Sequence, residues 1–466
     1  MTDRSDLSVP RVLVVSVNPL SETSNNGKTI ASFFKGYPKG RLAHLYFHRE
    51  PPSSDTCDNY ARITDAHILR YVRRVGREPV AVEMVSFAAR EAGSSIMPQR
   101  SLDLVKNWWW LRLARALVWR CIPWQSSPGL TDWLTRFGPQ VIFFCGGDAN
   151  YLYSAVESWS RRFGAPVVLY VTDDYILPAK TGSVARTITR LWTRYAFLRM
   201  ARTAPAVLTI GDRMEEVYRS RFGVESTPLM NAVDVESFPE RQLGGSRDPV
   251  SFVYVGSLHS NRGQVLVYLG EALRALRERG ISCELIYYAR AAAEGDLRLA
   301  LERSGVRYGG CLDAEGVRGA LASADVAVHV EAFDAGSRLV THLSLSTKIP
   351  EYMAAGAPVL AIGPSEIASM RYVRDGGFGL SVNSLSQSDI IQAAARLAGD
   401  PELRRELGRN GRNLALEQHD VRRCAPLVQG LLGEAAKHGL AKDHEGPDTA
   451  MCATRPKRRS DEPSKE

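Results

Sequence analysis

Short apolar runs alternate with longer segments of helical periodicity along most of the chain. Two of these runs, residues 11–17 and 250–258, are rich in β-branched side chains and end in small or polar residues. Each is followed by a glycine-containing loop and then by a helical pattern. Because strands that alternate with helices form parallel sheets with right-handed crossovers, the pattern predicts two doubly wound α/β domains in tandem.

The same alternation continues within both halves. Helices are expected between the strands, for example at 263–280 and 388–400. The further expected strands cover residues 42–48, 140–146, 166–173 and 206–211 in the first half and 282–289, 324–330, 358–363 and 378–382 in the second.

The boundaries of the domains follow from changes in composition. The stretch 239–249 is polar and rich in Gly and Pro, which is typical of a linker. We therefore expect one domain over residues 1–240 and a second over 241–420. A closing helix is expected at 421–436, and the charged segment 437–466, which lacks apolar periodicity, is expected to be a disordered tail.

Composition narrows the class of protein. With 466 residues the chain is too long for one ordinary core, which agrees with two domains. No apolar run reaches the roughly 18 residues of a membrane-spanning helix, and the acidic start does not resemble a signal peptide. The seven cysteines form no C-x-x-C pair, so reduced thiols, a cytoplasmic location and no zinc site are expected.

The net charge of +8 suits an anionic partner, which a nucleotide, a lipid headgroup surface or a nucleic acid would each provide. No nucleic-acid reader motif is evident, so nucleic-acid binding is not expected.

The first loop, residues 18–29, ends in Gly-Lys-Thr like a phosphate-binding Walker-A loop. That motif needs a glycine where this chain has Glu22, and a carboxylate there would repel phosphate. Walker-A binding is therefore rejected. Open α/β sheets instead bind ligands outside the carboxyl ends of their strands, where Asn26 and Gly27 would lie. Either residue could equally well form only a turn and a helix start.

Several segments of the second half, taken in order, resemble GT-B glycosyltransferases. Residues 252–273 resemble the strand, glycine loop and helix that open their donor domain, and residues 346–366, followed by 373–382, resemble their most diagnostic block. Residues 208–238 are similar to the segment before their domain linker. The large retaining family 4 is the most similar group. The resemblance implies two Rossmann-like domains that face a central cleft, with the donor in the second domain and the acceptor in the first.

The resemblance also implies donor-binding residues. Glu351 matches the glutamate that binds the ribose hydroxyls of the nucleotide, although an acid also suits a helix start. Thr347 and Lys348 match the loop that approaches the diphosphate and the sugar, and Arg262 matches the basic residue that pairs with the diphosphate. Gly256 matches the strand-end glycine that lets the backbone approach the ligand.

Two positions depart from the family pattern. Ser257 stands where many relatives carry an arginine, a loss for which Arg338 or Lys348 could compensate. Leu343 replaces the first glutamate of the family's E-x7-E motif, which approaches the transferred sugar in relatives. The candidates for its replacement are Glu331, Asp334 and His342.

In the first domain, Asp173 and Asp174 follow an expected strand and are the candidate catalytic residues. Relatives often have a histidine near this position that touches the donor sugar, and a carboxylate could do similar work or only cap the next segment. Asp148, after another strand, is a candidate acceptor contact together with Asn26 and Gly27. The resemblance implies no metal or cofactor, because Arg and Lys can stabilise the leaving diphosphate.

Two arginine- and aromatic-rich segments indicate a peripheral membrane contact. Residues 106–125 hold five of the eight tryptophans, and residues 186–203 hold five arginines. Such side chains favour the headgroup layer of an anionic membrane, which would suit a lipid-linked acceptor. Alternatively, both segments pack against the sheet and bury their tryptophans.

These observations predict a glycosyltransferase that moves a sugar from a nucleotide-sugar donor to a glycan or lipid-linked acceptor, with retention, in polysaccharide or cell-envelope biosynthesis. Two alternatives remain open. One is a sugar-nucleotide epimerase on the same fold, and the other is a non-catalytic GT-B-like binding subunit.

Overall fold

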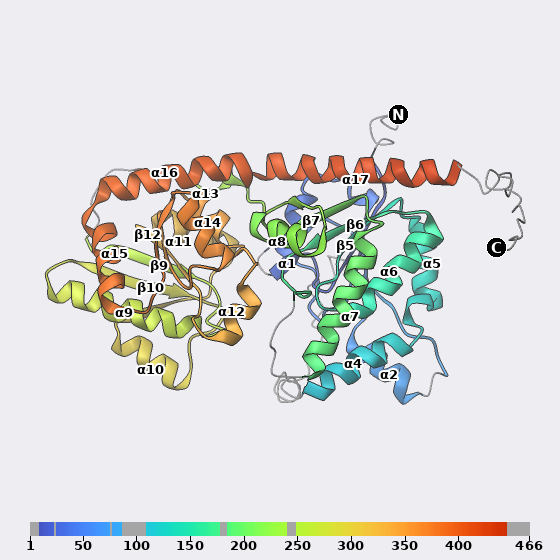
Figure 1. The fold of residues 1–466 in the computed structure, drawn as a ribbon, viewed down its shortest axis with the longest axis horizontal. Coiled ribbons are helices and arrows are strands. Elements are labelled where there is room, and N and C mark those ends of the chain that lie inside the picture. The colour runs from blue at the N-terminus through green and yellow to red at the C-terminus, as the bar shows by residue number, and fades with distance from the viewer. Residues whose placement is uncertain are drawn as a thin grey trace, which may run out of the picture.

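A computed structural model of the chain describes residues 9–22, 25–74, 77–85, 109–177, 184–239 and 248–444. Two α/β units lie side by side, and the last two helices follow one another along one side of them, one over each unit (Figure 1). The two-domain α/β architecture predicted from the alternation of strands and helices is confirmed. Most of the proposed linker, residues 240–247, and the end of the proposed tail, residues 445–466, lie outside the described residues.

The first domain is built on an eight-stranded sheet in the order β4-β3-β2-β1-β5-β6-β7-β8. All neighbouring strands are parallel except β3 and β4, which are antiparallel. The strands are β1 (Val12–Ser16), β2 (Leu42–Tyr46), β3 (Asn59–Arg62), β4 (Glu83–Val85), β5 (Val141–Cys145), β6 (Val167–Val171), β7 (Ala206–Thr209) and β8 (Thr227–Pro228).

The central strands of this sheet are fully buried because helices cover both faces, and their β-branched and aromatic side chains form the core. The covering helices are α1 (Asn25–Phe33), α2 (Asp65–Arg73), α4 (Trp109–Cys121), α5 (Pro128–Phe137), α6 (Asn150–Phe163), α7 (Val184–Ala201) and α8 (Asp212–Phe222). Short 3-10 turns, η2 (Lys39–Arg41), η4 (Trp124–Ser126) and η5 (Val235–Ser237), complete the connections.

The second domain has a six-stranded parallel sheet in the order β11-β10-β9-β12-β13-β14. Its strands are β9 (Val250–Val255), β10 (Cys283–Tyr288), β11 (Val306–Gly310), β12 (Val326–Val330), β13 (Val359–Ile362) and β14 (Gly379–Val382). Its helices are α9 (Arg262–Glu278), α10 (Gly295–Arg303), α11 (Ala314–Ser323), α12 (Ala335–Thr341), α13 (Ile349–Ala354), α14 (Ala368–Asp375), α15 (Gln387–Gly399) and α16 (Pro401–Gln418).

Each sheet reverses its strand order at one point. The reversal lies between β1 and β5 in the first domain and between β9 and β12 in the second. In open α/β sheets such a reversal leaves a crevice at the carboxyl ends of the strands, and that crevice is where ligands bind. The topology therefore directs attention to the loops that follow these four strands.

The helix α17 (Val421–His444) links the second domain back to the first and contacts α1, β5 and β6. The prediction that the closing helix ends at residue 436 is wrong, because the helix continues through residues 437–444. The physical reason is a buried stripe of small and apolar side chains. It includes Val428, Leu432 and Ala435, and Gly439 packs so closely that an added Cβ would lie 2.6 Å from the carbonyl oxygen of Gly164.

The tryptophan part of the predicted membrane contact is wrong for the residues that can be checked. Trp119 and Trp124 are each 1% exposed and pack edge-to-face against one another in the core of the first domain. Their ring nitrogens donate hydrogen bonds to Asp65 and to the Trp119 carbonyl. Residues 106–108 and the side chains of Trp109 and Trp110 lie outside the described residues.

Candidate functional site

The loop after β9 brings a glycine and a lysine together at the crevice of the second domain. Gly256 has a φ of 154°, and a Cβ added there would lie 2.0 Å from Lys348 Nζ. The same ammonium lies 5.5 Å from the centre of the Tyr254 ring, which is a cation–π distance. The close approach at Gly256 therefore makes room for the Lys348 ammonium.

The environment of Lys348 lowers the proton affinity of its side chain. Burial, with a smaller contribution from the positive charge of Arg262, lowers the pKa of Lys348 from 10.5 to about 8. Glu331 and Glu351 act in the opposite direction without overcoming these effects. An incoming anion would restore the stability of the charged form, so this lysine is suited to receive a phosphate group.

Arg262 is the second cation at this crevice, and Glu331 holds it in place. The guanidinium Nη2 lies 3.2 Å and 3.1 Å from the two carboxylate oxygens of Glu331, which is 2% exposed. The ring Nε2 of His329 lies 3.3 Å from the same carboxylate, without hydrogen-bond geometry. Burial alone would raise the pKa of Glu331, but His329 and Arg262 together hold that pKa below its usual value.

The loop between α12 and α13 and the first turn of α13 contact the first domain. The carbonyl oxygen of Thr347 accepts a 3.0 Å hydrogen bond from Asn231 Nδ2. Glu351, in the first turn of α13, accepts a hydrogen bond from the Lys28 ammonium on α1. The predicted ribose-binding carboxylate thus faces a lysine of the opposite domain. Lys28 was not predicted as a site residue. Its position in the Gly-Lys-Thr sequence at the end of the first loop was the one feature of the sequence that could have indicated a role in the site.

The two adjacent aspartates after β6 have different surroundings. Asp174 is buried and accepts hydrogen bonds from Arg190, Tyr218 and the backbone of its own turn. These contacts are structural and assign it no catalytic role. Asp173 is partly exposed and accepts a 2.6 Å hydrogen bond from Ser344 Oγ of the second domain. The structure therefore brings Asp173, but not Asp174, to the junction between the domains.

The candidate acceptor residues lie at the strand reversal of the first sheet. Asn26, in the first turn of α1, donates a 2.8 Å hydrogen bond to Thr172 Oγ1 next to Asp173. Asp148 lies in the loop after β5 and is exposed. Gly27 has a packing role, because a Cβ added there would lie 1.9 Å from the carbonyl oxygen of Pro19.

The residues considered as replacements for missing family groups are placed as follows. Leu343 is 1% exposed in the hydrophobic core. Asp334 caps α12 by accepting from the Ser337 backbone and also accepts from Asn261. Arg338 forms an ion pair with Glu366 at the surface. Its guanidinium charge is therefore already paired with a carboxylate.

Buried polar side chains also link the two domains around Asn231. Asn231 is 1% exposed, and its side chain also accepts a 2.7 Å hydrogen bond from Thr29 Oγ1. Its carbonyl oxygen lies 3.1 Å from Nδ1 of His419, whose Nε2 lies 2.8 Å from the Tyr372 hydroxyl. Burial lowers the pKa of His419 to about 4, so its ring is neutral near pH 7.

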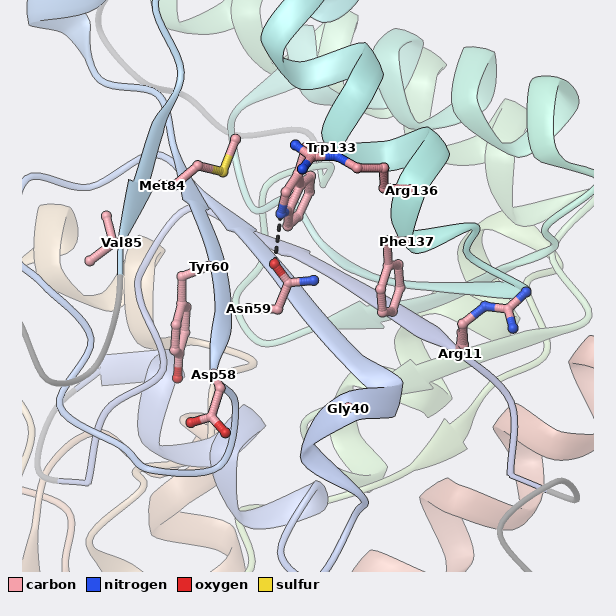
Figure 2. A pocket seen from close by; sticks show the side chains of 10 residues that line it. All are labelled: Arg11, Gly40, Asp58, Asn59, Tyr60, Met84, Val85, Trp133, Arg136 and Phe137. Atoms are coloured by element: carbon pink, nitrogen blue, oxygen red, sulfur yellow. Dashed lines mark hydrogen bonds between the residues drawn. The ribbon is translucent and has the colours of Figure 1, made fainter. Parts of the chain in front are cut away.

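A cavity of about 640 Å³ lies elsewhere in the first domain. Figure 2 shows Arg136, Trp133 and Phe137 from α5 on one side and Tyr60, Met84 and Val85 from β3 and β4 on the other. Arg11, Gly40 and Asn59 place it at the amino ends of β1, β2 and β3. Because ligands of open α/β sheets bind at the carboxyl ends, this cavity is not part of the candidate site.

Within the described ranges, no group of three or more His, Cys, Asp or Glu side chains is arranged to hold a metal ion. In the same part of the chain, no helix combines the length and the apolar character needed to cross a membrane.

Comparison with known sequences gives three main findings. Residues 249–400 match the family described as Glycosyl transferases group 1. The chain is 22% identical over 318 residues to the alpha-D-kanosaminyltransferase of Streptomyces kanamyceticus, covering 64% of this chain and 78% of that protein. It is 25% identical over 301 residues to the glycosyltransferase EpsD of Bacillus subtilis strain 168, covering 62% of this chain and 68% of that protein.

Comparison with solved structures concerns the fold. The HepE protein of Anabaena, crystallised with UDP and glucose, superposes with a TM-score of 0.57 at 14% identity. The match covers 91% of this chain and 99% of that one. At this identity the likeness shows the fold alone, and the fold it shows is the two-domain GT-B arrangement.

Proposed function

We propose, on the premise that this chain is a GT-B glycosyltransferase whose residues 249–400 belong to the group 1 family, that its second domain binds a nucleotide-sugar and its first domain binds the acceptor. A hydrogen bond joins Lys28 of α1 to Glu351 of α13, so the crevice of the first sheet meets the crevice of the second. This contact is the single observation that carries the assignment. A donor bound at Glu351 and an acceptor bound near α1 would therefore be held against each other.

The roles proposed for the second-domain residues follow from their chemistry. Glu351 would accept hydrogen bonds from the ribose hydroxyls, since a carboxylate can accept from two neighbouring donors. Lys348 and Arg262 would neutralise the charge that develops on the leaving diphosphate, a task that fixed cations in a partly buried crevice perform without reorganisation. Gly256 would keep the Lys348 ammonium in the crevice, and Thr347 would hold the loop on Asn231.

Retention of configuration by front-face attack is part of the proposal. The leaving diphosphate would help to remove the proton of the acceptor hydroxyl, and no metal or cofactor would be required. Asp148 and Asn26 would contact the acceptor from the two loops at the reversal of the first sheet.

The proposed acceptor is a glycan or a lipid-linked sugar, as in polysaccharide or cell-envelope assembly. A peripheral membrane contact, predicted at residues 106–125 and 186–203, is proposed now for α7 rather than for the tryptophans of the first segment. Val184, Leu191 and Tyr195 on α7 are 76%, 50% and 69% exposed. No acid occurs in this helix, which carries four arginines.

The experiment that tests the proposed function is a product analysis with radiolabelled UDP-, GDP-, ADP- and dTDP-hexoses, with and without a membrane extract as the source of acceptor. We expect label in a glycan or lipid product only when acceptor is present. A second sugar nucleotide formed from donor alone would identify an epimerase. Donor that stays intact in every mixture would favour the non-catalytic binding subunit.

A further inference from the structure

The carboxylate proposed to bind the ribose is occupied by a side chain of the other domain. The ammonium of Lys28, on α1 of the first domain, donates a hydrogen bond to Oε1 of Glu351 on α13. Among the residues that the structure describes, no other group hydrogen-bonds this carboxylate. The side chains of Lys28 and Glu351 are 24% and 14% exposed, so the two charges form a partly buried ion pair.

The backbone on both sides of this ion pair is held in place by a third residue. Thr29, which follows Lys28, donates a 2.7 Å hydrogen bond to Asn231 Oδ1. Nδ2 of the same asparagine donates a 3.0 Å hydrogen bond to the carbonyl oxygen of Thr347, in the loop before α13. The Lys28 ammonium, in contrast, is carried by a flexible four-carbon stem. The ion pair can therefore break by rotation of the lysine side chain, while both domains stay in place.

The lysine contact covers an oxygen that a ribose needs. A carboxylate binds a ribose best through both of its oxygens, one for each of the two neighbouring hydroxyls. Here the ammonium lies on Oε1, and little of the Glu351 side chain is open to an incoming group. A ribose that uses both oxygens must therefore displace Lys28. A 2′-deoxyribose offers one hydroxyl in place of two, and this hydroxyl can use Oε2 while Lys28 stays on Oε1.

We propose that Lys28 is a built-in competitor of the nucleotide for Glu351, an autoinhibitory contact through which the first domain occupies the ribose site of the empty second domain. This inference rests on the proposed function, in which Glu351 binds the ribose. Binding of a ribonucleotide replaces the interdomain ion pair with hydrogen bonds to the two hydroxyls and releases the Lys28 ammonium. The affinity of the donor site is thus set partly by a residue of the acceptor domain.

The proposal predicts the sign of a mutational effect. Loss of a side chain that contacts a ligand lowers the affinity for that ligand, whereas loss of a competitor raises it. Removal of the Lys28 charge should therefore strengthen the binding of a nucleoside diphosphate, although the ligand is an anion and the lost group is a cation. The gain should require the Glu351 carboxylate and the two ribose hydroxyls.

The test is titration calorimetry of UDP, GDP and ADP and of their 2′-deoxy forms with wild type, Lys28→Met, Glu351→Ala and the double variant. For the ribonucleotide that wild type binds, we expect Lys28→Met to lower the dissociation constant about fivefold, as the loss of a partly buried ion pair implies. The 2′-deoxy form should change less than about twofold. In the Glu351→Ala background, Lys28→Met should have no effect on either ligand.

Two further variants complete the design. Lys35→Met removes the same charge from the segment just after α1, where Lys35 pairs with Asp234, and it should bind like wild type. This control separates the competition from a general loss of positive charge. Lys28→Gln also removes the charge and should also raise the affinity, which keeps the test valid if Lys28→Met is poorly folded.

Four outcomes would overturn the inference. Weaker binding by Lys28→Met would make Lys28 a ligand of the diphosphate. An equal gain for the 2′-deoxy form, or a gain that persists without Glu351, would exclude competition for the ribose hydroxyls. A wild type that binds dTDP alone would also exclude it. If wild type binds no nucleotide, or if Glu351→Ala binds like wild type, the proposed function itself fails, and these results are distinct from all four.

Discussion

Lys348 is the residue whose chemistry is most sensitive to its surroundings. Its ammonium lies above the Tyr254 ring, in the space left by the missing side chain of Gly256, with Arg262 as a like charge nearby. Burial and Arg262 lower its pKa to about 8. The positive charge at the proposed diphosphate site is therefore present at neutral pH and lost at moderately alkaline pH.

This gives a prediction with two opposite pH trends. Affinity for a nucleoside diphosphate should be nearly constant between pH 7 and 8 and fall above pH 8, by up to about tenfold per pH unit, until only the attraction of Arg262 remains, because the neutral amine of Lys348 no longer attracts the anion. The contribution of Lys348 to the free energy of unfolding has the other sign. Between pH 8 and 10.5 the unfolded chain binds the proton and the folded chain does not, so this contribution rises with pH.

Titration calorimetry from pH 7 to 9.5 measures the first trend. Lys348→Met should bind weakly at every pH, without this slope. Lys35→Met removes a lysine that pairs instead with Asp234, and it should keep the wild-type profile. A flat profile for wild type would contradict the assigned role of Lys348.

At the residue scale, the sequence predicted which residues lie at the crevices better than it predicted which groups their side chains contact. Glu351, Lys348, Arg262 and Gly256 are at the second crevice, as expected from the resemblance, and their roles there stay predictions. Asp173 and Asp174 could not be told apart, because the direction of each side chain depends on the turn after β6 and on Arg190, sixteen residues away.

At the scale of elements, α7 separates into an inner and an outer face. Arg190 and Arg194 bind backbone carbonyl groups of the turn after β6, so they face the domain. Val184, Leu191 and Tyr195 recur at helical spacing on the face opposite the buried Thr193 and Phe197, and all three are exposed. In Figure 1, α7 lies beside α4. Apolar side chains are also exposed on α4, at Leu117, and on α2, at Leu69 and Val72.

We expect this face of α7 to bind vesicles that contain an anionic phospholipid. The triple variant Val184→Ser/Leu191→Ser/Tyr195→Ser should bind about tenfold or more weakly in a sedimentation assay, because it removes apolar area that would enter the headgroup layer. The control Leu416→Ser/Leu427→Ser changes two exposed leucines on α16 and α17 and should bind like wild type. Equal binding by the triple variant and the control would exclude this face.

The elements that the sequence predicted are those with long apolar runs. The strands β1, β2, β5, β6, β7, β9, β10, β12, β13 and β14 all fall within expected segments. The strand β3 was missed because its four residues begin with Asn59 and end with Arg62, and β11 was missed because it ends in two glycines. The last eight residues of α17 were missed because Lys437, Lys442 and Asp443 interrupt the apolar periodicity of the sequence.

At the scale of the whole molecule, the junction combines apolar packing that is continuous between the two domains with polar contacts between residues far apart in the chain. Lys28 and Glu351 are 323 positions apart, Asp173 and Ser344 are 171 apart, and Asn231 and Thr347 are 116 apart. The two-domain architecture could be predicted from strand order and from the resemblance. These pairs could not, because the local pattern around each residue says nothing about the opposite domain.

The measurement that tests the account most directly is thermal stabilisation by UDP, GDP, ADP and dTDP of wild type, Glu351→Ala and the control Glu366→Ala. A nucleotide at a hundredfold excess over its dissociation constant should stabilise the fold by about 2.7 kcal/mol. We predict that one nucleotide raises the melting temperature of wild type and of Glu366→Ala, while Glu351→Ala responds weakly. A full response by Glu351→Ala, or no response by wild type to any of the four, would contradict the donor site described above.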